Sequence, residues 1–230
     1  GGGHGDYRLI ALAPASVQEM ADFVGLAFDL AFKYRNPAII LADGVIGQMM
    51  EKVVLPEQRP RLTNEEVMAR CPWATFGKLK HRGPNIVTSL ELDPAEMEKR
   101  NIHLQQKYAE IEEKEVRYEE IHCDDAEYLI VAFGSCARIA QKAMEEARAE
   151  GIKVGLLRPI TLWPFPSKAI AERSRQVKGI LTVELNAGQM VEDVRLAVEC
   201  KVPVEYFGRL GGIVPDPDEV VTALKEKIIK

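Results

Sequence analysis

Short apolar runs recur along the chain, and the stretches between them carry apolar residues at helical spacing. In the first part, runs at 8–12 (RLIAL) and 38–42 (AIILA) enclose Val17, Met20, Val24, Ala27, Phe28 and Ala31. Their intervals of three and four predict an amphipathic helix, which Ser16 and Glu19 start as a capping box. The second run is apolar throughout, which is typical of a parallel strand covered on both faces. Strand, helix and strand predict a βαβ unit.

The pattern becomes regular in the last part of the chain. Apolar runs predict strands at 128–133, 153–157, 180–184 and 204–207. The periodic stretches between and after them predict helices at 137–150, 167–174 and 189–200 and one that starts at 216. Alternation of this kind indicates an α/β domain with a parallel sheet, which we place at 123–230.

The segment between these two parts has another character. Prolines interrupt 56–92, which has no sustained periodicity and is interpreted as a linker or an extended arm. Its small basic cluster is interpreted either as solvated surface or as a contact with an anionic partner, and comprises Lys78, Lys80, His81 and Arg82. Asp93, Pro94 and Glu96 then start a helix, with an apolar stripe at Met97, Leu104, Tyr108 and Ile111. Residues 93–127 hold 12 acidic and 5 basic residues, which predicts a largely solvated connecting helix.

Composition narrows the class of function. The 230 residues carry a net charge of −5, which argues against sequence-independent binding of nucleic acid. No apolar run reaches the roughly 18–20 residues of a membrane span. The cysteines lie far apart, at positions 71, 123, 136 and 200, so we expect no metal site and no iron–sulfur cluster in this chain. Reduced cysteines are typical of a cytoplasmic protein.

Ligands of open α/β sheets bind beyond the carboxyl ends of the strands. Four predicted loops lie there: 134–136, 158–165, 186–189 and 208–212. The first matches neither a dinucleotide fingerprint nor a nucleophile elbow, and is read as a tight turn. In the third, Asn186 and Gln189 suit either recognition or helix capping. The fourth, with Arg209 between glycines, can approach a phosphate, although two aspartates at the start of the next helix oppose an anion.

Two further candidates belong to the first part of the chain. His4, Gly5 and Asp6 precede the first strand and are either substrate contacts or a flexible end. Asp43 follows the second strand, but Ala42 stands where a thiamine diphosphate and magnesium motif requires glycine. No complete catalytic set is present.

Several long segments, taken together, resemble one enzyme family. LAPASVQEMADFVGLAFDLAFKYRNPAIILADGVIGQM, SLELDPAEMEKRNIHLQQKYAEIEEKEVRYEE, FGSCARIAQKA, LRPITLWPFP, VELNAGQM and FGRLGG resemble the alpha subunit of 2-oxoacid:ferredoxin oxidoreductases, in the 2-ketoisovalerate and 2-oxoglutarate branches. LRPITLWPFP also resembles the transketolase C-terminal domain.

This resemblance implies oxidative decarboxylation of a 2-oxoacid on thiamine diphosphate, release of an acyl-CoA and transfer of electrons to ferredoxin. It implies that a beta subunit holds the diphosphate and Mg, so that the cofactor lies at the subunit interface, with coenzyme A as co-substrate. Iron–sulfur clusters are expected in the beta subunit and in gamma or delta ferredoxin-like subunits. This chain alone is then expected to be inactive.

The resemblance also implies the domain organisation. The family's first domain begins upstream of His4, so we expect 1–55 to be the end of a pyrimidine-type thiamine-fold domain, 56–122 a linker with the acidic helix, and 123–230 a transketolase C-terminal-like domain. His4 and Asp6 are the weak catalytic candidates, and the weak cofactor-binding candidates are Gly5, Asp43, Asn186, Gln189 and Arg209. The alternative hypothesis is a non-catalytic α/β module that binds a partner or an anionic effector at 186–189 and 208–212.

Overall fold

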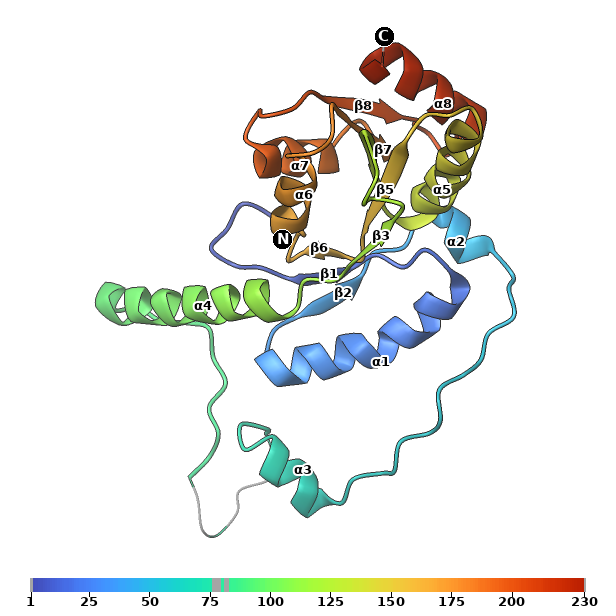
Figure 1. The fold of residues 1–230 in the computed structure, drawn as a ribbon. Helices are drawn as coiled ribbons and strands as arrows, with labels where there is room; N and C mark the ends of the chain where they lie inside the picture. Colours follow the sequence, from blue (N-terminus) through green and yellow to red (C-terminus); the bar gives the residue numbers. More distant parts are fainter. Residues whose placement is uncertain (1, 76–79, 81–82, 230) are drawn as a thin grey trace.

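The computed structural model describes residues 2–75, 80 and 83–229, which form two sheets with their helices (Figure 1). In the first sheet, β1 (Ile10–Leu12) pairs in parallel with β2 (Ala38–Ile40), as the sequence predicts. On its other side β1 pairs antiparallel with β6 (Thr161–Trp163), which comes from the second half of the chain. Sequence analysis treats that segment as a loop, because a strand of three residues with a distant partner has no periodic pattern.

The second sheet has the order β3-β5-β4-β7-β8. Its strands are β3 (Tyr118–Ile121), β4 (Tyr128–Ala132), β5 (Val154–Pro159), β7 (Ile180–Glu184) and β8 (Val204–Gly208). The last four are parallel, which confirms the predicted α/β architecture. β3 precedes the predicted domain, yet it forms the antiparallel edge strand beside β5.

Helices cover both faces of the second sheet (Figure 1). On one face lie α5 (Gly134–Ala149) and α8 (Pro217–Leu224), which a π-helical turn at Lys225–Ile229 continues. On the other face lie α6 (Ser167–Arg173) and α7 (Met190–Val198). Each pair of helices encloses its own buried apolar cluster, so all four parallel strands lie between two packed layers.

The predicted first helix is α1 (Val17–Tyr34), and its predicted start is confirmed. Ser16 Oγ accepts a hydrogen bond from Glu19 N at 3.1 Å, while the Glu19 carboxylate accepts from Ala15 N at 2.7 Å. Its predicted apolar face is wrong in part, because Phe23, Leu30 and Tyr34 are buried whereas two members of the predicted face, Val24 and Phe28, are exposed. The helix therefore has two apolar faces, one of which packs against β1.

The expectation that the second strand is covered on both faces is wrong. β2 lies at the free edge of the first sheet, and Ile39 and the following Leu41 are 37% and 48% exposed. An apolar run predicts a strand here correctly, but it does not determine which neighbours are present.

The predicted linker contains one short helix, and another helix precedes it. α2 (Gly44–Gln48) follows β2, and α3 (Asn64–Arg70) begins with a capping box of Thr63 and Glu66. Sequence analysis missed α3 because it has only two turns and no buried residue from which a stripe could be recognised. Of the predicted basic cluster, Lys78, His81 and Arg82 lie outside the described residues.

The acidic connecting helix is confirmed as α4 (Pro94–Lys114), which extends away from both sheets (Figure 1). Asp93 caps it by accepting hydrogen bonds from Ala95 N and Glu96 N at 2.8 and 3.2 Å. Tyr108 and Ile111, near its end, are buried against the first sheet, and most of the helix is solvated. Within the described part of the chain, no helix combines the length and apolar character needed to cross a membrane.

Candidate functional site

The carboxyl ends of the parallel strands bring part of the predicted site together. Asp43 reaches this edge from the first sheet, where its Oδ2 accepts a hydrogen bond from Ser135 N at 2.8 Å. Its Oδ1 accepts from Val45 N and Ile46 N, both at 3.0 Å. One carboxylate therefore caps α2 and α5 at once and joins the two halves of the chain. Gly134 is required beside it, because a Cβ there would lie 2.8 Å from Asp43 Oδ2.

Glu184, at the end of β7, does for α7 what Asp43 does for α5. Its side chain is buried, and its Oε2 accepts from Gln189 N at 3.2 Å and Met190 N at 2.8 Å. Its Oε1 accepts from Val191 N at 2.9 Å. Sequence analysis did not select Glu184; the available signal is an acidic residue that ends an apolar strand shortly before a helix.

Of the candidates selected at 186–189, Asn186 has a turn-forming role. Its Oδ1 accepts from Gly188 N at 2.8 Å, and its carbonyl accepts from the Tyr206 hydroxyl. Gln189 is exposed at the start of α7 and its backbone N–H is already bound to Glu184. This loop is therefore held by its own hydrogen bonds.

At 208–212, the Arg209 side chain pairs with one carboxylate of the same chain. Arg209 Nη2 lies 3.4 Å from Glu219 Oε1, and its backbone N donates to the Glu184 carbonyl at 3.3 Å. Asp216 and Glu219 form a capping box at the start of α8.

The N-termini of α5 and α7 at this edge are thus occupied by carboxylates of the chain itself, those of Asp43 and Glu184. At the start of α8, the Glu219 carboxylate accepts a hydrogen bond from Asp216 N at 3.1 Å. A phosphate or another anion would have to displace a negative group from each of these helix starts. The predicted phosphate contact at Arg209 therefore gains no support. A mainly apolar groove of about 530 Å³ lies beside these caps, between α2 and the loops that follow β7 and β8.

The structure separates the remaining candidates from this edge. His4, Gly5 and Asp6 precede β1, and all three are exposed. Asp6 and Arg8 line an open trough of about 820 Å³ along one side of α4. Of these three candidates, Asp6 thus lines the trough, away from the candidates at the carboxyl edge of the second sheet.

A buried arginine, which sequence analysis also missed, lies between the two sheets. The Arg158 side chain, from β5, pairs with Glu19 of α1 and with Glu119 of β3, the latter at 3.1 Å. Together with Asp43, this ion pair fixes the first sheet against the second.

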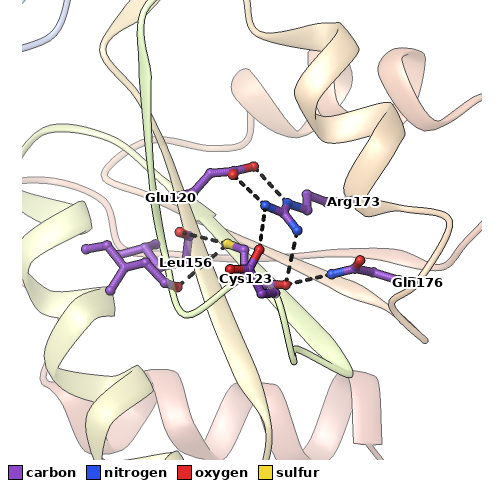
Figure 2. A network of polar contacts seen from close by, with 7 residues as sticks. Glu120, Cys123, Leu156, Arg173 and Gln176 are labelled. Atoms are coloured by element: carbon purple, nitrogen blue, oxygen red, sulfur yellow. Dashed lines mark hydrogen bonds and ion pairs between the residues drawn. The ribbon is translucent and has the colours of Figure 1, made fainter.

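Figure 2 shows Cys123, which follows β3, close to Leu156 of β5; its Sγ donates to the Leu156 carbonyl at 3.3 Å. In the same network, Arg173 binds Glu120 through two hydrogen bonds of 2.9 and 2.7 Å. Burial raises the pKa of the Cys123 thiol to about 11 and that of Cys136 to about 12. These two residues are therefore protonated structural thiols.

Replacing Asp43 by asparagine should lower the free energy of unfolding by about 1–2 kcal/mol, measured by urea denaturation. Asparagine retains one oxygen that can accept from the start of α2. Its NH2 group then faces Ser135 N, and because two donors cannot form a hydrogen bond, the bond to α5 is lost. Asp93→Asn is the matched control, because asparagine caps an exposed helix as well as aspartate does. Equal losses in the two variants would contradict the bridging role.

Comparison with protein families gives two matches that cover most of the chain. The model of the family described as pyruvate flavodoxin/ferredoxin oxidoreductase, thiamine diphosphate binding, matches residues 4–121, slightly more than half of the chain. The model described as pyruvate:ferredoxin oxidoreductase core domain II matches residues 126–220.

Curated relatives are similar over almost the whole chain. The ketoisovalerate oxidoreductase subunit VorB of Methanothermobacter thermautotrophicus is 49% identical over 226 residues, which cover 98% of this chain and 62% of the relative. The 2-oxoglutarate synthase subunit KorA of Archaeoglobus fulgidus is 33% identical over 218 residues, covering 94% and 60%. The chain thus spans about three-fifths of the length of these relatives.

Solved structures show the same fold. A 2-oxoglutarate:ferredoxin oxidoreductase from Magnetococcus marinus, with 2-oxoglutarate, coenzyme A and succinyl-CoA bound, aligns with a TM-score of 0.73 at 23% identity, covering 98% of this chain and 43% of that one. A split-gene transketolase, described as an inactive beta4 tetramer, aligns with a TM-score of 0.54 at 16% identity, covering 95% and 56%.

Proposed function

Because the chain belongs to the pyruvate flavodoxin/ferredoxin oxidoreductase family, we propose that it is part of a subunit that oxidatively decarboxylates a 2-oxoacid to an acyl-CoA. Ferredoxin is the proposed electron acceptor. The observation that carries this proposal is the match of a thiamine diphosphate-binding family over residues 4–121. The higher identity to a ketoisovalerate enzyme than to 2-oxoglutarate enzymes favours a branched-chain 2-oxoacid.

The described residues do not fit the diphosphate end of the cofactor. They contain no group of three or more His, Cys, Asp or Glu side chains that could hold a metal ion. The helix N-termini at the carboxyl edge of the second sheet suit a diphosphate in other folds. Here Asp43 and Glu184 fill those of α5 and α7, and the Glu219 carboxylate lies at that of α8. We assign the diphosphate and its magnesium to the beta subunit, so that the cofactor lies between the two subunits.

The described residues do not fit an iron–sulfur cluster either. Cys123 and Cys136 are buried thiols in separate places, whereas Cys71 lies after α3 and Cys200 is exposed after α7. We assign the clusters to the beta subunit and to gamma or delta ferredoxin-like subunits. Coenzyme A enters the proposal as a co-substrate, with no residue of this chain assigned to it.

The proposed contribution of this chain is a scaffold that carries one wall of the cofactor site. Residues 1–55 supply two parallel strands and a helix of a pyrimidine-type thiamine-fold domain. Residues 56–117 connect it to the transketolase C-terminal-like domain, to which we assign 118–230 because β3 is an edge strand of the second sheet. The hydrogen bond from Ser135 N to Asp43 joins the two parts, since it connects the segment after β2 to the start of α5.

The alternative of an anion-binding module at 186–189 and 208–212 has less support. The backbone N–H groups that an anion would use are bound to Glu184 and to the α8 capping box.

Co-expression of the full-length subunit that contains these 230 residues with the beta and ferredoxin-like subunits tests the proposal. The complex should reduce methyl viologen with 2-ketoisovalerate, thiamine diphosphate, magnesium and coenzyme A, and it should be less active with 2-oxoglutarate. The purified 230-residue chain should give no turnover under the same conditions, because its described residues provide neither a set of magnesium ligands for the diphosphate nor a set of cluster ligands.

Two results would contradict the proposal. Turnover by the chain alone would place a complete site within it. If the complex assembles with its cofactor and clusters but oxidises no 2-oxoacid, the proposed activity is wrong and the chain has a structural or binding role.

A further inference from the structure

A cavity of about 450 Å³ lies where the end of α4 meets β3, β6 and the start of α6 (Figure 1). Its lining comes from two segments, 112–118 and 163–172, and we call it the α4–α6 cavity. Its volume is in the range of pockets that bind small molecules, about 300–1,000 Å³. The cavity is therefore large enough to hold a ligand of its own.

Aromatic rings form part of the lining. Tyr118 of β3, Trp163 of β6 and Phe165 line the cavity. The Trp163 ring is fixed by Tyr108 of α4, which meets it edge to face with the ring centroids 5.8 Å apart. Tyr118 is 43% exposed, so its ring remains accessible to a ligand. The electrons of aromatic rings attract cations, and a lining of this kind suits an organic cation.

Carboxylates in the lining favour the same sign of charge. Glu112 and Glu113 of α4 and Glu172 of α6 line the cavity, and all three are exposed. Lys168 also lines it, so acidic groups outnumber basic groups three to one. Basic residues that adjoin these segments are already paired: Lys114 with Glu110, Arg117 with Glu115, and Arg173 with Glu120. The lining therefore attracts a cation and repels an anion.

The cation that fits this lining is larger than a metal ion. Among the described residues, no three acidic, histidine or cysteine side chains are placed to hold a metal. An alkylated guanidinium or ammonium group has an apolar stem that packs against aromatic rings and a charged head that pairs with carboxylates. We propose that the α4–α6 cavity binds an organic cation of this kind. Because its charge disfavours phosphate-bearing molecules, this inference does not depend on the proposed activity.

Isothermal titration calorimetry of the full-length subunit that contains these 230 residues tests the proposal, with n-butylguanidine as the probe. n-Butylurea is the matched neutral probe, since it has nearly the same shape and no charge. The guanidinium should bind with an affinity at least about tenfold higher than that of the urea. Added salt should weaken its binding, because the carboxylates are exposed to solvent. Equal affinities for the two probes, or no binding of either, would overturn the proposal.

Substitutions in the lining locate the bound probe. Glu113→Gln and Glu172→Gln should each raise the dissociation constant of butylguanidine about threefold, since each removes one partly solvated charge partner. Both side chains are exposed, so these variants should keep the thermal unfolding temperature of the parent. Glu192→Gln, in the exposed first turn of α7, is the control and should leave the dissociation constant unchanged. Tyr118→Leu should weaken binding as well, because it removes a ring and keeps an apolar side chain. If none of the three lining variants binds more weakly, the probe lies elsewhere and the proposal is wrong.

The same titration distinguishes two sources of the cation. If the complex with the partner subunits still binds butylguanidine, the cavity takes a free organic cation. If only the uncombined subunit binds it, a lysine or arginine side chain of a partner subunit takes its place in the complex. Both results are read from binding and not from turnover, so failure of the proposed activity leaves them unchanged.

Discussion

Replacing Glu115 by alanine is expected to lower the free energy of unfolding at neutral pH by about 3 kcal/mol. Glu115 follows α4, is buried, and accepts hydrogen bonds from Lys33 Nζ and Tyr34 Oη, both at 2.7 Å, and from Arg117 Nη1 at 3.0 Å. Its removal leaves the buried Tyr34 hydroxyl without an acceptor and separates α1 from the end of α4. Urea denaturation at pH 7 measures the loss.

The same carboxylate predicts a pH dependence of stability. Burial alone would raise the pKa of Glu115, whereas the hydrogen bonds from Lys33, Tyr34 and Arg117 lower it to about 2. In the unfolded chain, the pKa of a glutamate side chain is about 4.3. Because the folded pKa is the lower one, the stabilisation is complete above about pH 5 and is lost as the pH falls toward about 2.

Glu115→Gln is the matched control for this pH dependence. Glutamine keeps an acceptor for Tyr34 but has no charge, so its unfolding free energy should depend less on pH between about 5 and 2 than that of the parent chain. The parent and the variant should converge toward acid pH. A constant difference between them over this range would contradict the assignment of the charge to this cluster.

Elements that are defined by their own residues could be predicted from the sequence. β7 was predicted with its observed bounds, because a mainly apolar run between turns suits a strand buried on both faces. α4 was predicted at its observed start. The Asp93 side chain accepts hydrogen bonds from the first backbone N–H groups of the helix, and Pro94, which has no N–H, suits the first helical position. In both cases the signal is contained in a few consecutive residues.

Elements that depend on distant partners could not be predicted in this way. β3 and β6 are strands because they pair with β5 and β1, respectively. Neither short segment has an apolar run of its own. The two apolar faces of α1 overlap in sequence, so periodicity indicates a helix but not which face packs. The exposure of Phe28 is therefore a property of the assembled fold.

The candidate site shows the same division. Position beyond the carboxyl ends of parallel strands was enough to select Asp43, Asn186, Gln189 and Arg209, and the structure brings their segments to one edge. Their roles depend on which helix N-terminus each carboxylate reaches. That is a three-dimensional relation, so Glu184 was missed although it makes three hydrogen bonds there, and the two-helix cap by Asp43 was not foreseen.

Replacing Glu184 by alanine should lower the free energy of unfolding by about 3–4 kcal/mol, since three backbone donors at the start of α7 lose their acceptor in a buried place. Glu184→Gln should cost less, because its one carbonyl oxygen still accepts. Glu192→Ala, in the exposed first turn of α7, is the control and should cost under about 0.5 kcal/mol. Urea denaturation gives the three values, and amide exchange at Met190 and Val191 should accelerate in Glu184→Ala alone. If the exchange rates at those two amides stay unchanged, Glu184 does not hold the start of the helix, and the filled anion site at this edge of the sheet has to be explained differently.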